Sequence, residues 1–409
     1  MRELPEGWKP LRLRDAGIWL SGGTPSTDEP RFWGGDIPWI SAASMKNFYI
    51  HDSDRRLTKS GSSAGTQIVG EGSVLFVVRG MSLKKEFRVG VTQRELAFGQ
   101  DCKAIIPRQD IDGTFLALAL RVAAGEILSM VDEAGHGTGR LPTDMISRLE
   151  IGIPPLPEQR RIVEILNTLD FRIENQQAIL EKLKNVTTAV VTDQLTRIID
   201  PTEAVLPLAA LASVTSGVTL GTETGGSVEL PYLRVANVQD GFIDTSEMKS
   251  VRVSRADAKR YLLEAGDVLL TEGGDLDKLG RGAVWDARID PCICQNHVFR
   301  VRCERTLLLP EYLAAFSSSH QGKRYFLSIA KQTTNLASIN SSQLKNMPIP
   351  LPSIELQKRL IDVANTGAGR INHESSELQR LNLLKQGLLE DLLTGEVRVS
   401  DAEAVLENL

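Results

Sequence analysis

The sequence predicts an α+β protein: two similar globular domains joined by two long antiparallel coiled-coil helices, with an internal pseudo-twofold repeat. Three observations lead to this prediction. A 38-residue segment occurs twice, both copies have the apolar spacing of a long helix, and each copy follows a strand-rich stretch. With 409 residues, of which 42% are hydrophobic and 24% charged, the chain has the composition of a globular protein with more than one domain.

The repeat is clearest between Gln159–Thr196 and Gln357–Thr394, which align without a gap at an offset of 198 residues. Eleven of the 38 aligned positions are identical, far more than chance would give. Fainter similarity continues upstream, where EGSVLF at 71–76 resembles AGDVLL at 265–270. We therefore predict a first domain at 1–154, a central helical region at 155–200, a second domain at 201–350 and a C-terminal helical region at 351–409.

Both copies carry apolar residues at alternating spacings of three and four, which is typical of a coiled-coil seam. A helix of about 40 residues would be roughly 60 Å long, more than a helix that covers a single domain needs. Gly395 is expected to end the second helix. The residues expected to pack the helix pair are Ile162, Leu166, Leu169, Ile173, Leu180, Leu183, Leu360, Ile371, Leu378, Leu381 and Leu388. The alternative, in which each helix lies on its own domain, stays open.

The two globular halves share a plan of short apolar strands followed by one helical stretch. In the first half we expect this helix at Thr114–Val131, and in the second near Glu311–Ile329. The loops differ far more between the copies than the strands do, and loops usually carry recognition. The pattern predicts two like scaffolds that read different targets.

The motifs of common enzymes are missing from the sequence. It contains no G-x-x-x-x-G-K-[ST] phosphate loop and no Asp/Asn-Pro-Pro-aromatic tetrapeptide of an adenine methyltransferase. The GHGTG stretch at 135–139 follows what we expect to be a continuing helix, so we interpret it as a loop. The triplets of the D-x-K and E-x-K type lack the preceding Pro-Asp of a nuclease. We predict a chain without catalytic residues.

Cysteines and histidines gather in one place, at Cys292, Cys294, His297 and Cys303. Such a set contains enough ligands for zinc. However, the aligned stretch of the first half has only Cys102, which aligns with His297, and a structural metal would be expected in both copies. We therefore expect sheet residues here and no metal. The N-terminus lacks an apolar signal region and no apolar stretch is long enough for a bilayer, so we expect a cytoplasmic protein.

The net charge is −5, yet two stretches are locally basic. Val77–Arg94 holds five cationic residues and one acid, and Tyr312–Ile354 holds no acid. Cations hold phosphates, while amides and hydroxyls can read base edges. We expect DNA contacts from Arg79, Lys84, Lys85, Arg88, Thr138, Arg140, Thr271, Lys278, Arg281, Lys331, Gln332, Thr333 and Asn335. An acidic chain would bind DNA weakly by itself, so a partner with further phosphate contacts is expected.

Several motifs, taken in order, resemble one known family. They are Gly7–Trp8, SGGTPST at 21–27, GGDIPWIS at 34–41, GSVLFVVRG at 72–80 and IPPLPEQRRIVEIL at 153–166. With their echoes in the second half, they make the whole chain resemble the specificity subunit of a type I restriction–modification system.

This resemblance implies two target recognition domains, each reading one half of a split double-stranded DNA sequence. It also implies an antiparallel helix pair that acts as a spacer and docks two methyltransferase subunits. Those subunits would carry S-adenosylmethionine, and up to two restriction subunits would bring ATP and Mg; this chain would bind no cofactor. Gly367 and Gly369 replace Leu169 and Phe171 in the second copy, and each is expected to loosen the helix by about 1 kcal/mol. The rivals are a protein-binding coiled-coil scaffold and a self-sufficient methyltransferase.

Overall fold

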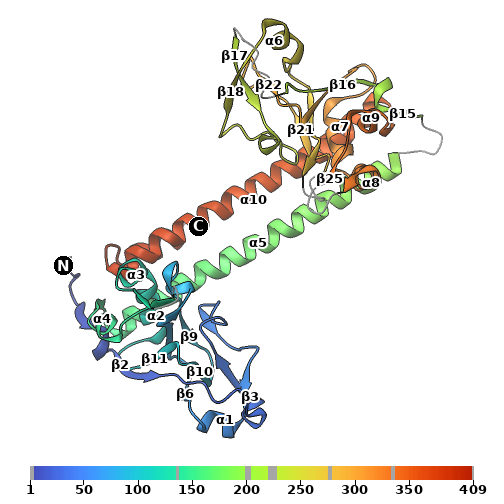
Figure 1. Cartoon of the computed structure of the whole chain (residues 1–409). Helices are drawn as coiled ribbons and strands as arrows, with labels where there is room; N and C mark the ends of the chain where they lie inside the picture. Colours follow the sequence, from blue (N-terminus) through green and yellow to red (C-terminus); the bar gives the residue numbers. More distant parts are fainter. Residues whose placement is uncertain are drawn as a thin grey trace. The chain divides into compact units, whose positions relative to one another are not determined.

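The computed structural model describes residues 4–134, 138–198, 204–219, 228–274, 279–332 and 337–407. The chain forms two compact units, residues 1–176 with 377–409 (the first unit) and residues 177–376 (the second unit). Each contains a globular domain and parts of both long helices, α5 (Leu156–Ile198) and α10 (Ile354–Thr394) (Figure 1). The predicted division separates domains from helices, whereas the compact units combine them.

In the first unit, the main sheet has the strand order β2–β11–β7–β9–β4. These strands are Gly17–Ser21, Cys102–Pro107, Val74–Val77, Val89–Thr92 and Tyr49–Ile50. The other sheets are β5–β3–β10–β6 (Arg56–Leu57, Trp33–Ile40, Leu96–Phe98, Gln67–Val69), β1–β14 (Lys9–Arg12, Glu150–Ile153) and β12–β13–β8 (Asp132–Ala134, Thr138–Arg140, Arg79–Gly80). The short helices are α1 (Lys59–Ser63), α2 (Gly113–Val122), α3 (Ala124–Ser129), α4 (Thr143–Ser147) and α11 (Val399–Glu407).

In the second unit, the main sheet has the order β16–β23–β19–β21, formed by Ala212–Ser216, Val298–Cys303, Val268–Thr271 and Gly282–Val284. The other sheets are β18–β17–β22 (Lys249–Val253, Val228–Leu233, Ile293–Cys294), β15–β26 (Val205–Pro207, Pro348–Pro350) and β20–β25–β24 (Gly273–Gly274, Ala337–Ser338, Lys331–Gln332). The short helices are α6 (Arg255–Tyr261), α7 (Pro310–Ser318), α8 (His320–Ile329) and α9 (Ser341–Lys345).

The repeat extends to strand order and register. The series β2–β11–β7–β9 corresponds to β16–β23–β19–β21, and β12–β13–β8 corresponds to β24–β25–β20. Strand pairing also corrects the sequence alignment by one residue. Cys102 faces Val77 across β11 and β7, and its counterpart, Val298, faces Thr271 across β23 and β19. Val298, and not the neighbouring His297, therefore corresponds to Cys102.

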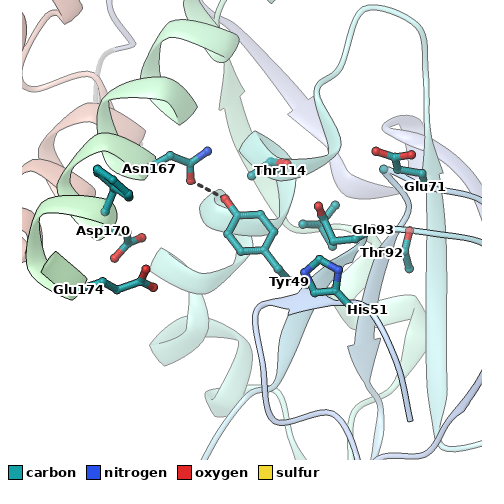
Figure 2. Close-up of a pocket in the computed structure, with 12 residues that line it drawn as sticks. Tyr49, His51, Glu71, Thr92, Gln93, Thr114, Asn167, Asp170 and Glu174 are labelled. Carbon is teal, nitrogen blue, oxygen red and sulfur yellow. Dashed lines mark hydrogen bonds between the residues drawn. The ribbon is translucent and has the colours of Figure 1, made fainter. Parts of the chain in front are cut away.

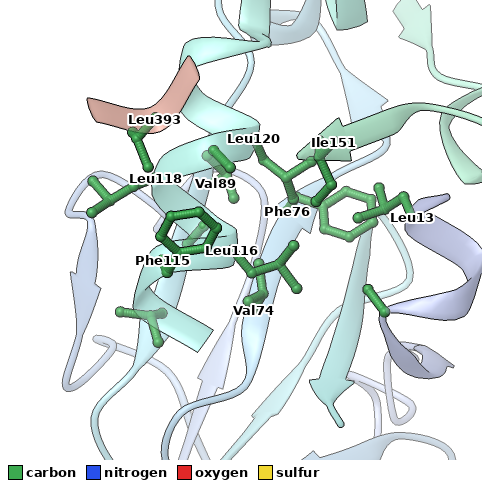
Figure 3. Close-up of a cluster of buried hydrophobic side chains, with 14 of the residues drawn as sticks. Leu13, Val74, Phe76, Val89, Phe115, Leu116, Leu118, Leu120, Ile151 and Leu393 are labelled. Atoms are coloured by element: carbon green, nitrogen blue, oxygen red, sulfur yellow. The ribbon is translucent and has the colours of Figure 1, made fainter. Parts of the chain in front are cut away.

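Apolar residues of α5 and α10 form part of the domain cores. In the first unit, Leu166 and Leu169 of α5 share one buried cluster with Leu388 and Leu392 of α10 and with Phe115 of α2. Figure 3 shows Leu393 of α10 beside the domain core. The beginning of α5 therefore packs both on its own domain and on the end of α10. The helix pair and the packing of a helix on its own domain, given as alternatives from the sequence, occur together in this unit. The prediction of an α+β fold with an antiparallel helix pair is confirmed.

The residues expected at packed positions of the helix pair fall into two groups. Eight of them are buried: Ile162, Leu166, Leu169, Ile173, Leu180, Leu360, Leu381 and Leu388. Leu183, Ile371 and Leu378 are half-buried.

In the second copy of the long helix, α10, Gly367 lies where the two long helices are close together. A Cβ atom on Gly367 would lie 2.3 Å from Thr187 Cγ2, so α5 and α10 approach closely there in the second unit. Gly369 has open space around it. The expected loosening of the helix stays a prediction for both glycines, and at Gly367 the small residue also permits close packing against Thr187.

Three local expectations are also corrected. The helix expected at Thr114–Val131 is broken into α2 and α3 at Ala123. The stretch before GHGTG ends as strand β12, not as a helix; Gly135–Gly137 lie outside the described residues. Gly395, with φ +78°, ends α10 as predicted, but a further helix, α11, follows and packs on the first domain through the fully buried Ala402.

Candidate nucleic-acid interface

The three-stranded sheet β12–β13–β8, here called the first ribbon, carries two of the predicted arginines side by side. Arg140 of β13 faces Arg79 of β8 on one side and Asp132 of β12 on the other. Both arginines are exposed. Like charges directly across a ribbon destabilise it, so this pair is suited to a surface that receives an anion.

The turn that follows β8 extends this basic surface. Leu83 anchors the turn in the core, while Lys84 and Lys85 are exposed beside it. Met81, 79% exposed, projects from the same turn. Arg79, Arg140, Lys84 and Lys85 together are called the first basic surface below.

Two predicted residues of the first domain lie near this surface in more constrained positions. Thr138, on β13, is half-buried. Arg88 is half-buried as well, and its guanidinium donates to Glu86 Oε2 at 3.0 Å and to the Ala42 carbonyl at 3.2 Å. Arg88 therefore fastens a loop in addition to any contact it makes outside the chain.

The corresponding sheet in the second unit, β24–β25–β20, is called the second ribbon. Across it, Lys331 faces Ser338, which faces Gly273, so a serine and a glycine stand where the first ribbon has two arginines. Lys331 is exposed. Beside the ribbon, His297 Nδ1 and Glu272 Oε2 lie 2.7 Å apart. The two ribbons have the same strand order and register, and they differ in the side chains that stand at matching positions.

The structure places the remaining predicted residues of the second domain less favourably. Thr271 is 1% exposed within β19 and therefore cannot contact DNA, so its prediction as a contact residue is wrong. Arg281 is half-buried, and its buried Nε has no hydrogen-bond partner among the described residues. Gln332 lies on β24, but its side chain is outside the described residues, as are Lys278, Thr333 and Asn335.

One cationic feature of the first domain was missed in the sequence. The guanidinium of Arg55 lies 3.9 Å from the ring centre of Trp33 and 4.7 Å from that of Trp39. Such stacking holds an exposed cation in one orientation. The two tryptophans in WGGDIPW were the available signal, but their arginine partner comes from a separate loop.

A cavity of about 510 Å³ lies between the main sheet of the first domain and α5 (Figure 2). Tyr49 Oη donates to Asn167 Oδ1 at 2.5 Å across its edge, and burial raises the pKa of Tyr49. Asp170 and Glu174 give it an acidic wall, and Asp170 also pairs with Lys385 of α10. The acidic lining of this cavity does not suit a phosphate. The hydrogen bond from Tyr49 to Asn167 joins the domain to α5.

A buried glutamine joins domain and helix in both units. Gln159 of α5 is 0% exposed; its Oε1 accepts from the Asp112 amide at 2.8 Å. Its Nε2 donates to the carbonyls of Asp110 at 3.0 Å and Pro154 at 2.8 Å. Asp112 is the N-cap of α2.

Gln357 of α10 repeats this arrangement and is also 0% exposed. It accepts from the amide of Leu309, the N-cap of α7, at 2.9 Å. It donates to the carbonyls of Leu307 and Pro352, each at 2.9 Å. We call Gln159 and Gln357, with these bonds, the glutamine latches.

The thiols of the cysteine cluster are protonated; Cys294 and Cys303 lie on strands β22 and β23, and Cys292 lies just before β22. Burial raises the pKa of Cys292, Cys294 and Cys303 to about 12 each. The nearby His297 pairs with Glu272. Within the described part of the chain, no three His, Cys, Asp or Glu side chains are grouped so that they could hold a metal ion. Nor does any described helix combine the length and apolarity needed to cross a bilayer.

Comparisons with known proteins agree with this geometry. The model of the type I restriction modification DNA specificity domain matches residues 5–185 and 219–366. The chain is 24% identical over 427 residues to the specificity subunit of the type I restriction enzyme EcoKI of Escherichia coli K12, covering 97% of this chain and 90% of that one. It is 30% identical over 165 residues to the EcoR124I/EcoR124II specificity subunit of Escherichia coli, covering 40% of each chain.

A solved structure shares the fold across nearly the whole length. It comes from work on complex assembly and conformational transition of the type I restriction–modification system; 97% of this chain and all of that chain align, with a TM-score of 0.65 and 18% identity. The family model matches both halves of the chain and the beginnings of both long helices. The protein therefore belongs to the type I restriction modification DNA specificity family, as a specificity subunit and not as a catalytic one.

Proposed function

We propose that the chain reads a bipartite DNA target, with one recognition domain on each half, and docks two methyltransferase subunits through the helix pair. The observation that carries this proposal is the ribbon that occurs in both domains on the same backbone but with different side chains. Equivalent scaffolds with unlike surfaces suit two half-sites of unlike sequence.

In the proposed complex, the chemistry lies on other chains. The methyltransferase subunits bind S-adenosylmethionine and methylate adenine, and up to two restriction subunits use ATP and Mg for cleavage. A specificity chain with a net charge of −5 gains affinity for DNA from such partners, because they add phosphate contacts. Since the complex acts on the DNA of its own cell, we propose the cytoplasm as its location.

The helix pair would act as a ruler between the half-sites. Each added helical residue lengthens a helix by about 1.5 Å, so four residues add roughly 6 Å, close to two base pairs. We expect an insertion of four residues into the middle of both α5 and α10 to shift the preferred spacing of the half-sites to a larger value.

The test uses the complex reconstituted with a methyltransferase subunit. Sequencing of methylated DNA gives the target, and methylation of duplexes with varied spacing then gives the preferred spacing. The matched control carries the same four residues in the surface loop at Asp52–Asp54. A preferred spacing that is unchanged by the helix insertions would refute the ruler, and failure of the complex to bind DNA would refute the proposal as a whole.

A further inference from the structure

We propose that the two glutamine latches are positioning residues that fix the angle at which each domain is held on its helix. By fixing this angle, they restrict the complex to a narrow range of distances between the two half-sites. This inference rests on the proposed function, because spacing matters only if the chain reads two half-sites. It concerns how each domain is fixed within its own unit.

In each latch, the amide oxygen accepts one hydrogen bond and both N–H groups of the amide donate one, and the three partners are backbone atoms at separate points. One is the N-cap of the domain helix, one is the carbonyl two residues before it, and one is the proline carbonyl at the entry to the long helix. Backbone atoms cannot swing away as side chains do. An amide bound at three such points therefore fixes both the distance and the direction between helix and domain.

The latch is preserved where its surroundings have changed. Asp112 caps α2 with its own carboxylate, while Leu309 caps α7 without a side-chain bond. The helix starts also differ, with LPEQRR in one and IELQKR in the other. The same three bonds nevertheless form in both units, at distances of 2.8–3.0 Å. A requirement for burial alone would be met by many apolar residues, whereas three directed bonds require the amide.

The consequence for DNA follows from its geometry. One base pair moves a half-site by about 3.4 Å along the duplex and rotates it by roughly a tenth of a turn. A domain that tilts on its helix can follow such a displaced half-site. A domain held to its helix by two directed backbone bonds of a buried amide cannot, so its complex discriminates against the wrong spacing.

The experiment compares Gln159→Met and Gln357→Met with Gln177→Met and Gln379→Met, which change exposed glutamines on the same two helices. Each variant is reconstituted with the methyltransferase subunit. Methylation is measured on duplexes with the native spacing and with one base pair more or fewer. We expect the preference for the native spacing to fall about tenfold in each latch variant, as the loss of buried hydrogen bonds would allow, and to stay unchanged in the controls.

The outcomes separate the inference from the proposed function. A wild-type complex without any spacing preference would refute the ruler itself. A wild-type preference that persists in the latch variants, with equal loss of methylation at all spacings, would overturn the positioning role and leave only a stabilising one. Where a Met variant does not fold, Gln159→Asn or Gln357→Asn keeps the amide but shortens its reach, and the same ratio of methylation rates decides.

Discussion

The two ribbons differ while the frames that hold them agree. The frames match down to single hydrogen bonds, since Gln159 and Gln357 contact corresponding backbone atoms in the two units. In contrast, Arg79 and Arg140 of the first ribbon correspond to Gly273 and Ser338 of the second. The comparison teaches that the duplicated chain keeps the parts that position its domains and varies the parts that face outwards.

The helix packing differs between the units as well. The fully buried Leu169 helps to fill the first unit, where the second unit has Gly367 against Thr187. The first unit also has α11, whose Glu403 pairs with Arg161 of α5. The two long helices thus pack differently in the two units. In the first unit a large apolar side chain fills the space, and in the second a glycine lets the helices approach closely.

The largest effect is expected where the first unit depends on apolar filling. Leu169→Ala removes a side chain that is 0% exposed, and should lower the free energy of unfolding by about 2–5 kcal/mol. Leu383→Ala on α10, at a position 69% exposed, should change it by less than about 0.5 kcal/mol. Urea titration followed by circular dichroism measures both. Equal losses would mean that the seam does not stabilise the unit.

The next effect tests the two arginines of the first ribbon against the uncharged residue at the matching position of the second. Arg79→Ala and Arg140→Ala should each weaken binding of the methyltransferase complex to DNA by about tenfold, and reduce the slope of log affinity against log salt by about one. Ser338→Ala, at the position that corresponds to Arg140, should leave the slope unchanged. Fluorescence anisotropy over a range of salt concentrations measures this. An unchanged slope in both arginine variants would remove the first basic surface from the interface.

A smaller effect tests the close approach in the second unit. Gly367→Ala gains about 1 kcal/mol of helix preference but places a methyl group against Thr187, at a cost of about 1–3 kcal/mol, so a net loss is expected. In a Thr187→Ala background the same change should stabilise the protein. Gly369→Ala, in open space, should raise stability by about 1 kcal/mol in either background. Thermal melting of these variants in both backgrounds would contradict this account if, with Thr187 in place, Gly367→Ala raised the stability as Gly369→Ala does.

The smallest effect concerns two tyrosines. Tyr49 donates to Asn167 in the first unit, and Tyr325 donates to the Gln343 carbonyl at 2.8 Å in the second. Loss of either bond through Tyr49→Phe or Tyr325→Phe should cost about 1 kcal/mol. Burial raises the pKa of both phenols above the ordinary value of 10.0, so their contribution is complete below about pH 10 and is lost as the pH rises through the folded-state pKa. Stability curves of wild type and variants that stay parallel above pH 10 would contradict this.

The sequence predicted features that depend on local pattern or on repetition. Apolar spacing predicted the long helices, Gly395 predicted the end of α10, and a run of cations predicted the basic stretch that contains Arg79, Lys84 and Lys85. Features that depend on tertiary contacts could not be predicted. Thr271 lies in an apolar strand whose burial follows from pairing with β23, and the partners of Gln159 come from a loop almost 50 residues away. The helix α11 was missed because its short apolar face has meaning only against the first domain.

The central claim is that one frame holds two independent readers. The most direct measurement is selection of DNA from a random pool by the methyltransferase complex, followed by sequencing, for wild type and for the Arg79→Ala/Arg140→Ala variant. The account predicts that the wild type selects a two-part motif with fixed spacing, and that the variant relaxes one part while the other part and the spacing stay the same. Relaxation of both parts, or a change of spacing, would contradict it.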